Sequence, residues 1–248
     1  MLFPKTGHRT AEGVVQGVGM KAACSLKDVA EHGRIRLSLL GGFSLANGRR
    51  DVSLPASCQR VLAYLALNDQ PTPRTLVAGT LWLDAPEEQA QACLRSALWR
   101  IRRAAGDVVV ATGSRLEIGG DVALDVRAMV AVSRALIEGD AGSVDSLPEP
   151  SRLSSRLLPG WYDDWVLFEQ ERLRQLGAYA LEELAWLLAS HGRFGAAIDA
   201  GLTAVRVEPL RESAHRVVMA IHLLQGNRRD ALRQFRSLER VLRSDLDG

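Results

Sequence analysis

The chain has 248 residues and a net charge of +2, and its 47% hydrophobic and 24% charged residues are typical of a globular protein with room for two domains. Three cysteines, Cys24, Cys58 and Cys93, are too few and too widely spaced for a disulfide framework or a zinc site. No apolar run reaches the roughly 18–20 residues that a membrane helix needs, and the N-terminus has no clear signal peptide. We therefore expect a cytoplasmic protein.

Charge is distributed unevenly along the chain. Residues 34–119 contain 11 Lys and Arg against 7 Asp and Glu, whereas residues 120–248 contain 16 against 19. A basic front half followed by a mildly acidic back half favours nucleic acid as a partner of the front half.

Residues 1–33 are rich in glycine and lack a clear period. They are predicted to form a poorly ordered N-terminal extension. Met20, which is followed by Lys21, is a candidate for the true start of the protein.

The next segment predicts a pair of strands. "RIRLSLLGGFSL" alternates apolar and polar side chains and places Ile35, Leu37 and Leu39 on one face. "NGRR" at 47–50 is a turn signal, and "DVSLP" is typical of a short returning strand.

Three helices and a hairpin are expected after the strands. Residues 56–68 and 75–84 show helical spacing and are separated by the proline-containing "QPTPR". The third helix covers 85–106, and "DVVVATGSRLEIGG" at 107–120 predicts a hairpin. The expected core side chains are Val61, Leu62, Leu65 and Ala66 in the first helix and Leu76, Leu81 and Trp82 in the second. This order of elements within 34–119 is that of a winged helix-turn-helix of the response-regulator effector type.

Residues 120–248 are predicted to be almost entirely helical, apart from a polar, proline-containing stretch at 140–160. Near the end, "HGRFGAAI" and "QGNRRDAL" lie 34 residues apart, which pairs Gly192 with Gly226 and Ala197 with Ala231.

Thirty-four residues is the period of the tetratricopeptide repeat. We expect two helix-turn-helix units, at 178–211 and 212–245. The predicted fold class is therefore mainly α with a small amount of β: an N-terminal winged helix-turn-helix at 34–119 and a C-terminal, all-α, tetratricopeptide-like domain at 120–248.

The third helix of the front half carries the strongest functional signal. Leu94, Leu98, Ile101 and Ala105 recur at helical spacing and form one buried stripe. The rest of the helix carries four arginines without an acid on the same turns: Arg95, Arg100, Arg102 and Arg103. Such like charges repel each other, phosphates would neutralise them, and arginine can pair with guanine in the major groove.

An arginine-rich helix face is also common as a plain solvated surface. The context favours DNA, because this helix is the third of a trihelical unit and precedes a hairpin with Thr112, Ser114 and Arg115 at its tip. Trp99 has two open interpretations: it packs against the second helix, or it contacts a thymine methyl group or a sugar. The other tryptophans are expected in the core or between helices: Trp82, Trp161, Trp165 and Trp186.

No catalytic arrangement is visible in the sequence. His215 and His222 share a helix face, but no acidic or cysteine partner is placed to complete a metal site, and no nucleophile has a base beside it. We expect neither enzymatic activity nor a metal or cofactor.

Four segments together resemble the Streptomyces antibiotic regulatory protein family in its minimal form: "IRLSLLGGFSL", "LWLDAP", "LRSALWRIRRAAG" and "LLPGWYDDWVLFEQERLRQL". The resemblance implies a winged helix followed by a bacterial transcriptional activation domain. It also implies an activator that binds direct DNA repeats near a promoter as a side-by-side homodimer and recruits RNA polymerase, for example at a biosynthetic gene cluster.

Site residues follow from the same resemblance. The recognition helix is 89–105, its arginines are the DNA contacts, and Ser96 is a candidate for a contact to a base edge. The connection at 83–88 corresponds to the segment that touches the sigma factor, so Asp84, Glu87 and Glu88 are candidates for polymerase contact. One departure from the family pattern is "GSRLEIG" in the wing, which lacks the usual Gly-Tyr pair.

Two other functions stay open at this point. The tetratricopeptide-like half is also compatible with a module that binds a peptide or a small signal, with the front half as a degenerate winged helix that serves as a scaffold. A winged helix near a promoter can also repress transcription by blocking polymerase.

Overall fold

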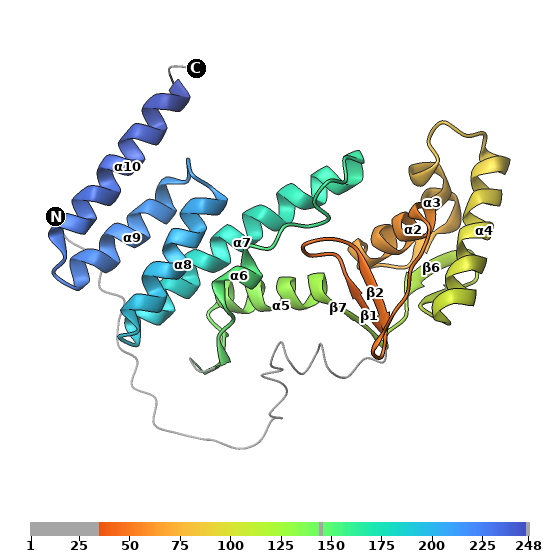
Figure 1. The fold of residues 1–248 in the computed structure, drawn as a ribbon, viewed down its shortest axis with the longest axis horizontal. Helices are drawn as coiled ribbons and strands as arrows, with labels where there is room; N and C mark the ends of the chain where they lie inside the picture. The colour runs from red at the N-terminus through yellow and green to blue at the C-terminus, as the bar shows by residue number, and fades with distance from the viewer. Residues whose placement is uncertain (1–34, 144–145, 247–248) are drawn as a thin grey trace, which may run out of the picture.

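The computed structural model describes residues 35–143 and 146–246, and its two parts follow one another along the long axis of the molecule (Figure 1). Two small sheets and three helices form one end, and helices alone form the other. The predicted extension at 1–33 lies outside the described residues. The expected fold class, mainly α with a winged helix in front, is confirmed.

The first sheet has four strands in the order β3-β2-β1-β7. Their bounds are β1 Ile35–Ser38, β2 Ser44–Asn47, β3 Arg50–Asp51 and β7 Val122–Leu124. The single strand expected from "RIRLSLLGGFSL" is in fact two, because Gly41 and Gly42 turn the chain with φ values of +80° and +142° that favour glycine. Leu37 and Leu39 are buried as expected, while Ile35 is half-buried.

β7 was not expected from the sequence. It pairs in parallel with β1, with Ile35 opposite Val122 and Leu37 opposite Leu124. The last strand of the front sheet is thus supplied by residues that follow the wing.

The winged-helix elements follow in the predicted order. Their bounds are α2 Ala56–Leu67, β4 Thr72–Pro73, α3 Arg74–Leu81, α4 Glu87–Ala105, β5 Val109–Thr112 and β6 Arg115–Ile118. β4 falls in the segment expected only to break the helices, and it pairs with β6 to give a second sheet of order β4-β6-β5.

One expected core residue of this half is misplaced by the sequence analysis. Leu76 is 52% exposed, because the short helix α3 turns Val77, Ala78 and Leu81 toward the core instead. Trp82, at the end of α3, is half-buried against the same core.

The back half consists of helices that pack in sequence. Their bounds are α5 Asp125–Glu138, α6 Pro150–Leu153, α7 Asp164–Ser190, α8 Phe194–Val207, α9 Glu212–Leu224 and α10 Arg228–Leu246. The predicted repeat is confirmed in phase: Gly192 and Gly226 adopt positive φ at the turns, and Ala197 and Ala231 are buried.

Two details of the back half differ from expectation. The first helix of the first repeat begins at Asp164 rather than at 178. Trp186 is 40% exposed, because the neighbouring Leu184 and Ala185 occupy the packed side of α7.

A half-buried carboxylate joins the two halves. The Asp125 carboxylate, at the start of α5, accepts hydrogen bonds from the backbone N–H groups of Leu39 and Leu40 at 3.0 Å and of Val126 at 2.8 Å. Burial raises the pKa of Asp125, although these bonds to the ionised form oppose the rise. Asp125 therefore fixes the end of β1 to the start of the helical half.

The segment before α7 contacts the same strand end. Leu158 N–H donates to the Leu39 carbonyl at 2.8 Å, and Gly41 N–H donates to the Arg156 carbonyl at 2.7 Å. These bonds extend the sheet edge into the helical half, so the two halves are joined through backbone as well as through side chains.

We predict that Asp125→Ala lowers the free energy of unfolding by about 1–3 kcal/mol, because buried N–H groups lose their acceptor. Asp125→Asn has a smaller effect, because its amide oxygen still accepts some of the hydrogen bonds from these backbone N–H groups. Urea denaturation followed by circular dichroism measures both. An Asp125→Ala variant as stable as the wild type would show that the carboxylate does not stabilise the contact between the end of β1 and the start of the helical half.

A second prediction concerns the packing of α6 on α7. A methyl group at Gly177 would collide with the Leu153 carbonyl oxygen, whereas one at Gly79, in α3, meets nothing within 4 Å. We expect Gly177→Ala to destabilise the protein by about 1–3 kcal/mol. Gly79→Ala, the matched control, is expected to be neutral or stabilising, since alanine is the better helix former. Equal thermal shifts for the two variants would contradict the close approach.

Candidate nucleic-acid interface

Helix α4 has one buried side and one fully exposed side. The buried residues are Ala90, Leu94, Ala97, Ile101 and Ala105. The predicted buried stripe is correct except at Leu98, which is half-buried at the edge of the stripe. Ala97 is fully buried in its centre instead. The opposite side of the helix faces solvent along its whole length.

All the predicted contact residues of α4 lie on that exposed side: Arg95, Ser96, Trp99, Arg100, Arg102 and Arg103. By helical geometry, Ser96, Trp99 and Arg103 lie opposite the buried stripe. The interpretation that packs Trp99 against the second helix is wrong, because its side chain is 60% exposed. The Arg103 guanidinium instead lies over its ring, 5.3 Å from the centroid.

The arginines of α4 are almost without acidic partners. Arg102 lies 3.3 Å from Asp107, but both side chains are nearly four-fifths exposed, so the pair contributes little. Asp107 lies just beyond the end of the helix, so the helical pattern did not identify it as a partner. Arg95, Arg100 and Arg103 form no ion pair within residues 35–143 and 146–246.

The position of α4 leaves its exposed side accessible. Figure 1 places α4 at one end of the molecule, with α8, α9 and α10 at the other. None of its arginines pairs with a carboxylate of the helical half in the part of the chain described. No described carboxylate of the helical half therefore neutralises this side of α4.

The hairpin after α4 forms the expected wing. Thr112, Ser114 and Arg115 are exposed at its tip. Arg115 Nη1 donates to the Pro71 carbonyl at 2.8 Å, and Arg74 N–H donates to the Ser114 carbonyl at 2.9 Å. The wing tip is thus fixed to the connection between α2 and α3, and part of the Arg115 guanidinium is already used.

The connection between α3 and α4 is strongly exposed. Asp84, Glu87 and Glu88 all face solvent, and the last two lie in the first turn of α4, where acidic side chains are stabilised by the helix dipole. Beside them Leu83 is 83% exposed. The pattern at 75–84 gave no sign of this exposure, since Leu83 falls within the predicted second helix, where an apolar residue is ordinarily expected in the core.

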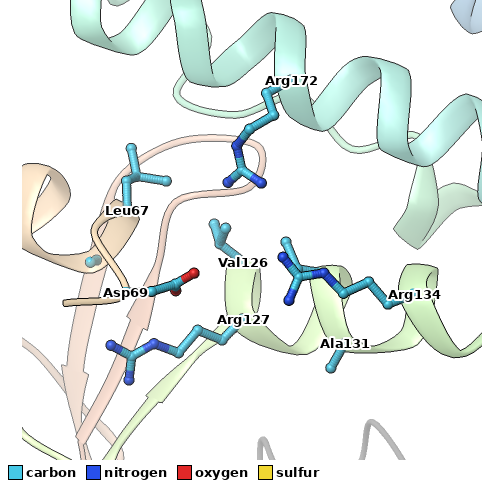
Figure 2. A pocket seen from close by; sticks show the side chains of 9 residues that line it. Leu67, Asp69, Val126, Arg127, Ala131, Arg134 and Arg172 are labelled. Carbon is cyan, nitrogen blue, oxygen red and sulfur yellow. The ribbon is translucent and has the colours of Figure 1, made fainter.

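A small cavity lies where the two halves meet. Figure 2 shows Arg127 and Arg134 of α5, Arg172 of α7 and Asp69 around it. Its volume is about 260 Å³, enough for a few waters or one small anion. It contains none of the predicted site residues.

Two general features of the described residues bear on function. Within 35–143 and 146–246, none of the helices combines the length and apolar character needed to cross a membrane. The same residues contain no group of three or more His, Cys, Asp or Glu placed to hold a metal ion.

Residues 153–248 match the family model of the bacterial transcriptional activator domain. The match covers α7 to α10 and the segment that leads into them. It agrees with the resemblance seen in "LLPGWYDDWVLFEQERLRQL", which lies inside the matched residues.

Among solved structures, the chain is similar to Mycobacterium tuberculosis EmbR, determined in complex with a low affinity phosphopeptide. The TM-score is 0.68 at 20% identity, over 86% of this chain. The chain spans 61% of the length of the EmbR chain. The likeness shows a shared fold that includes both the winged-helix end and the helical end. No curated protein matches the chain.

Proposed function

We propose that the protein is a sequence-specific DNA-binding transcriptional activator. The observation that carries the proposal is the exposed, nearly unpaired arginine side of α4, held at the outer end of a molecule whose other end matches the bacterial transcriptional activator domain.

α4 enters the major groove in this proposal, since an α-helix fits its width. Ser96, Trp99 and Arg103, opposite the buried stripe, face base edges, with Trp99 against a thymine methyl group or a sugar. Arg95 and Arg102 along one edge and Arg100 along the other bind phosphates, which position the helix without reading sequence.

The wing adds backbone contacts from Thr112, Ser114 and the free part of Arg115. Two protomers bind side by side on direct repeats near a promoter, as the family resemblance implies, and the target is a biosynthetic gene cluster. The exposed connection at 83–88 then faces polymerase, with Asp84, Glu87 and Glu88 contacting the sigma factor and Leu83 as an apolar anchor beside them.

We predict that Arg100→Ala and Arg102→Ala each weaken promoter binding by about 1–2 kcal/mol without unfolding the protein, because each removes a phosphate contact. Affinity falls steeply with salt through counterion release, and each variant flattens that slope. Fluorescence anisotropy with DNA from the protein's own genomic neighbourhood, at several salt concentrations, measures both effects.

Arg229→Ala is the matched control, because Arg229 is an exposed arginine of α10 at the opposite end of the molecule. If all three variants bind like the wild type, α4 is not the recognition helix. If the wild type binds no duplex and is not retained on heparin, the front half is a scaffold and the helical half an interaction module.

A separate prediction concerns activation. Replacing Leu83 and Asp84 with alanine lowers promoter-dependent transcription in vitro several-fold while DNA affinity stays unchanged, because both side chains are exposed and lie outside the DNA-facing side of α4. Glu138→Ala, on α5, is the control. If the double variant supports full transcription, the segment 83–88 does not contact polymerase.

A further inference from the structure

A second, larger cavity lies within the helical half. Its volume is about 700 Å³, and it is open to solvent, bordered by the segment 153–162, α7 and α8. Apolar side chains form part of its lining, among them the exposed Leu167 and the half-buried Val207. This volume is in the range of small-molecule sites.

One wall of this cavity is held rigidly. Gln170 Nε2 donates to the carbonyls of Leu157 and Leu158 at 2.9 and 3.2 Å. Leu158 has a φ of +39°, a left-handed backbone that a leucine rarely adopts. Its N–H group is bound to Leu39 of the front sheet. The wall is therefore preformed, and its strained residue is held by contacts on both sides.

Arginines on three elements add positive charge to the lining. Arg174, on α7, is paired with Glu171 and Glu208 and is locally neutralised. Arg206, on α8, donates to the Thr203 hydroxyl at 2.8 Å, which fixes the direction of its guanidinium. Arg156 lies on the wall segment.

The positive charge of the lining is only partly compensated. Neither Arg156 nor Arg206 forms an ion pair with any residue in the described part of the chain. Glu171 is the one carboxylate among the described residues that line the cavity, against three guanidinium groups. A ligand would thus meet apolar side chains and two cations that lack a counter-charge.

We propose that this cavity binds an amphipathic organic anion, with an apolar ring system against Leu167 and Val207 and a carboxylate, sulfonate or phosphate group on Arg156 and Arg206. The site belongs to the residues that match the activator domain, and it is independent of DNA binding. Because the wall segment is hydrogen-bonded to β1, an occupant would contact the joint between the two halves.

The test compares two dyes with the same ring system on the full chain. 8-Anilinonaphthalene-1-sulfonate carries the anion, and N-phenyl-1-naphthylamine lacks it. We expect the sulfonate dye to bind saturably at one site per chain. The double variant Arg156→Gln/Arg206→Gln weakens that binding by about tenfold or more, since it removes charge-assisted bonds. It changes the affinity for the neutral dye by less than about twofold.

Arg228→Gln/Arg229→Gln is the matched control, because these exposed arginines lie on α10 near the exposed apolar residues Leu224 and Leu232. It removes the same charge beside a surface patch that could also attract the dye. Since Arg156 and Arg206 are exposed, their variant is expected to keep the wild-type circular dichroism spectrum and melting temperature.

A location measurement completes the test. Trp161 lines the cavity, so Trp161→Phe lowers energy transfer from tryptophan to the bound sulfonate dye, whereas Trp99→Phe on α4 does not. The proposal is overturned if the cavity variant binds the sulfonate dye like the wild type, if only the α10 variant loses binding, or if binding never saturates.

Discussion

The end of β1 is the constraint on which the rest of the structure depends. Buried N–H and C=O groups must be paired, and at Leu39 they are paired with segments far away in the sequence. The Asp125 carboxylate accepts the N–H, and Leu158 N–H binds the C=O. The front sheet and two segments of the helical half meet at this residue. Val166 and Leu173 of α7 join the same apolar core as Leu37.

That shared core explains how an arginine-rich helix is tolerated. Like charges on α4 cost free energy, and within residues 35–143 and 146–246 a single exposed acid, Asp107, pairs with one of them. The apolar side of the helix, from Ala90 to Ala105, carries the stability instead. The arginine side chains of α4 therefore still repel one another, and a polyanion would reduce that repulsion. The packing of the apolar side fixes the position of the helix without any partner.

The helical half is organised around one long helix. α7 begins in the core of the front half and ends in the second core, where Leu181, Leu184 and Leu188 pack with α8 and α9. Glu182 of α7 is buried and bonded to Arg211 and to Ser213. Burial of Arg211 alone would lower its pKa, but Glu182 and Tyr179 together outweigh that effect, so the pKa of Arg211 is raised. The 700 Å³ cavity lies between these fixed elements and the wall segment.

The sequence by itself determined the longer helices, the wing and the arginine side of α4, because a helical period repeated over ten or more residues overrides local ambiguity. The four-residue helix α6 falls in the stretch 140–160, which was expected to interrupt the helices. The sequence also placed the turns at Gly192 and Gly226. Only the tertiary structure decided the rest. β4 and β7 have two and three residues, too few to show a period, and they exist only because a partner strand lies beside them. Leu76 and Trp186 are exposed, and both cavities form, because of how segments distant in the chain pack against one another. No local sequence pattern encodes that packing.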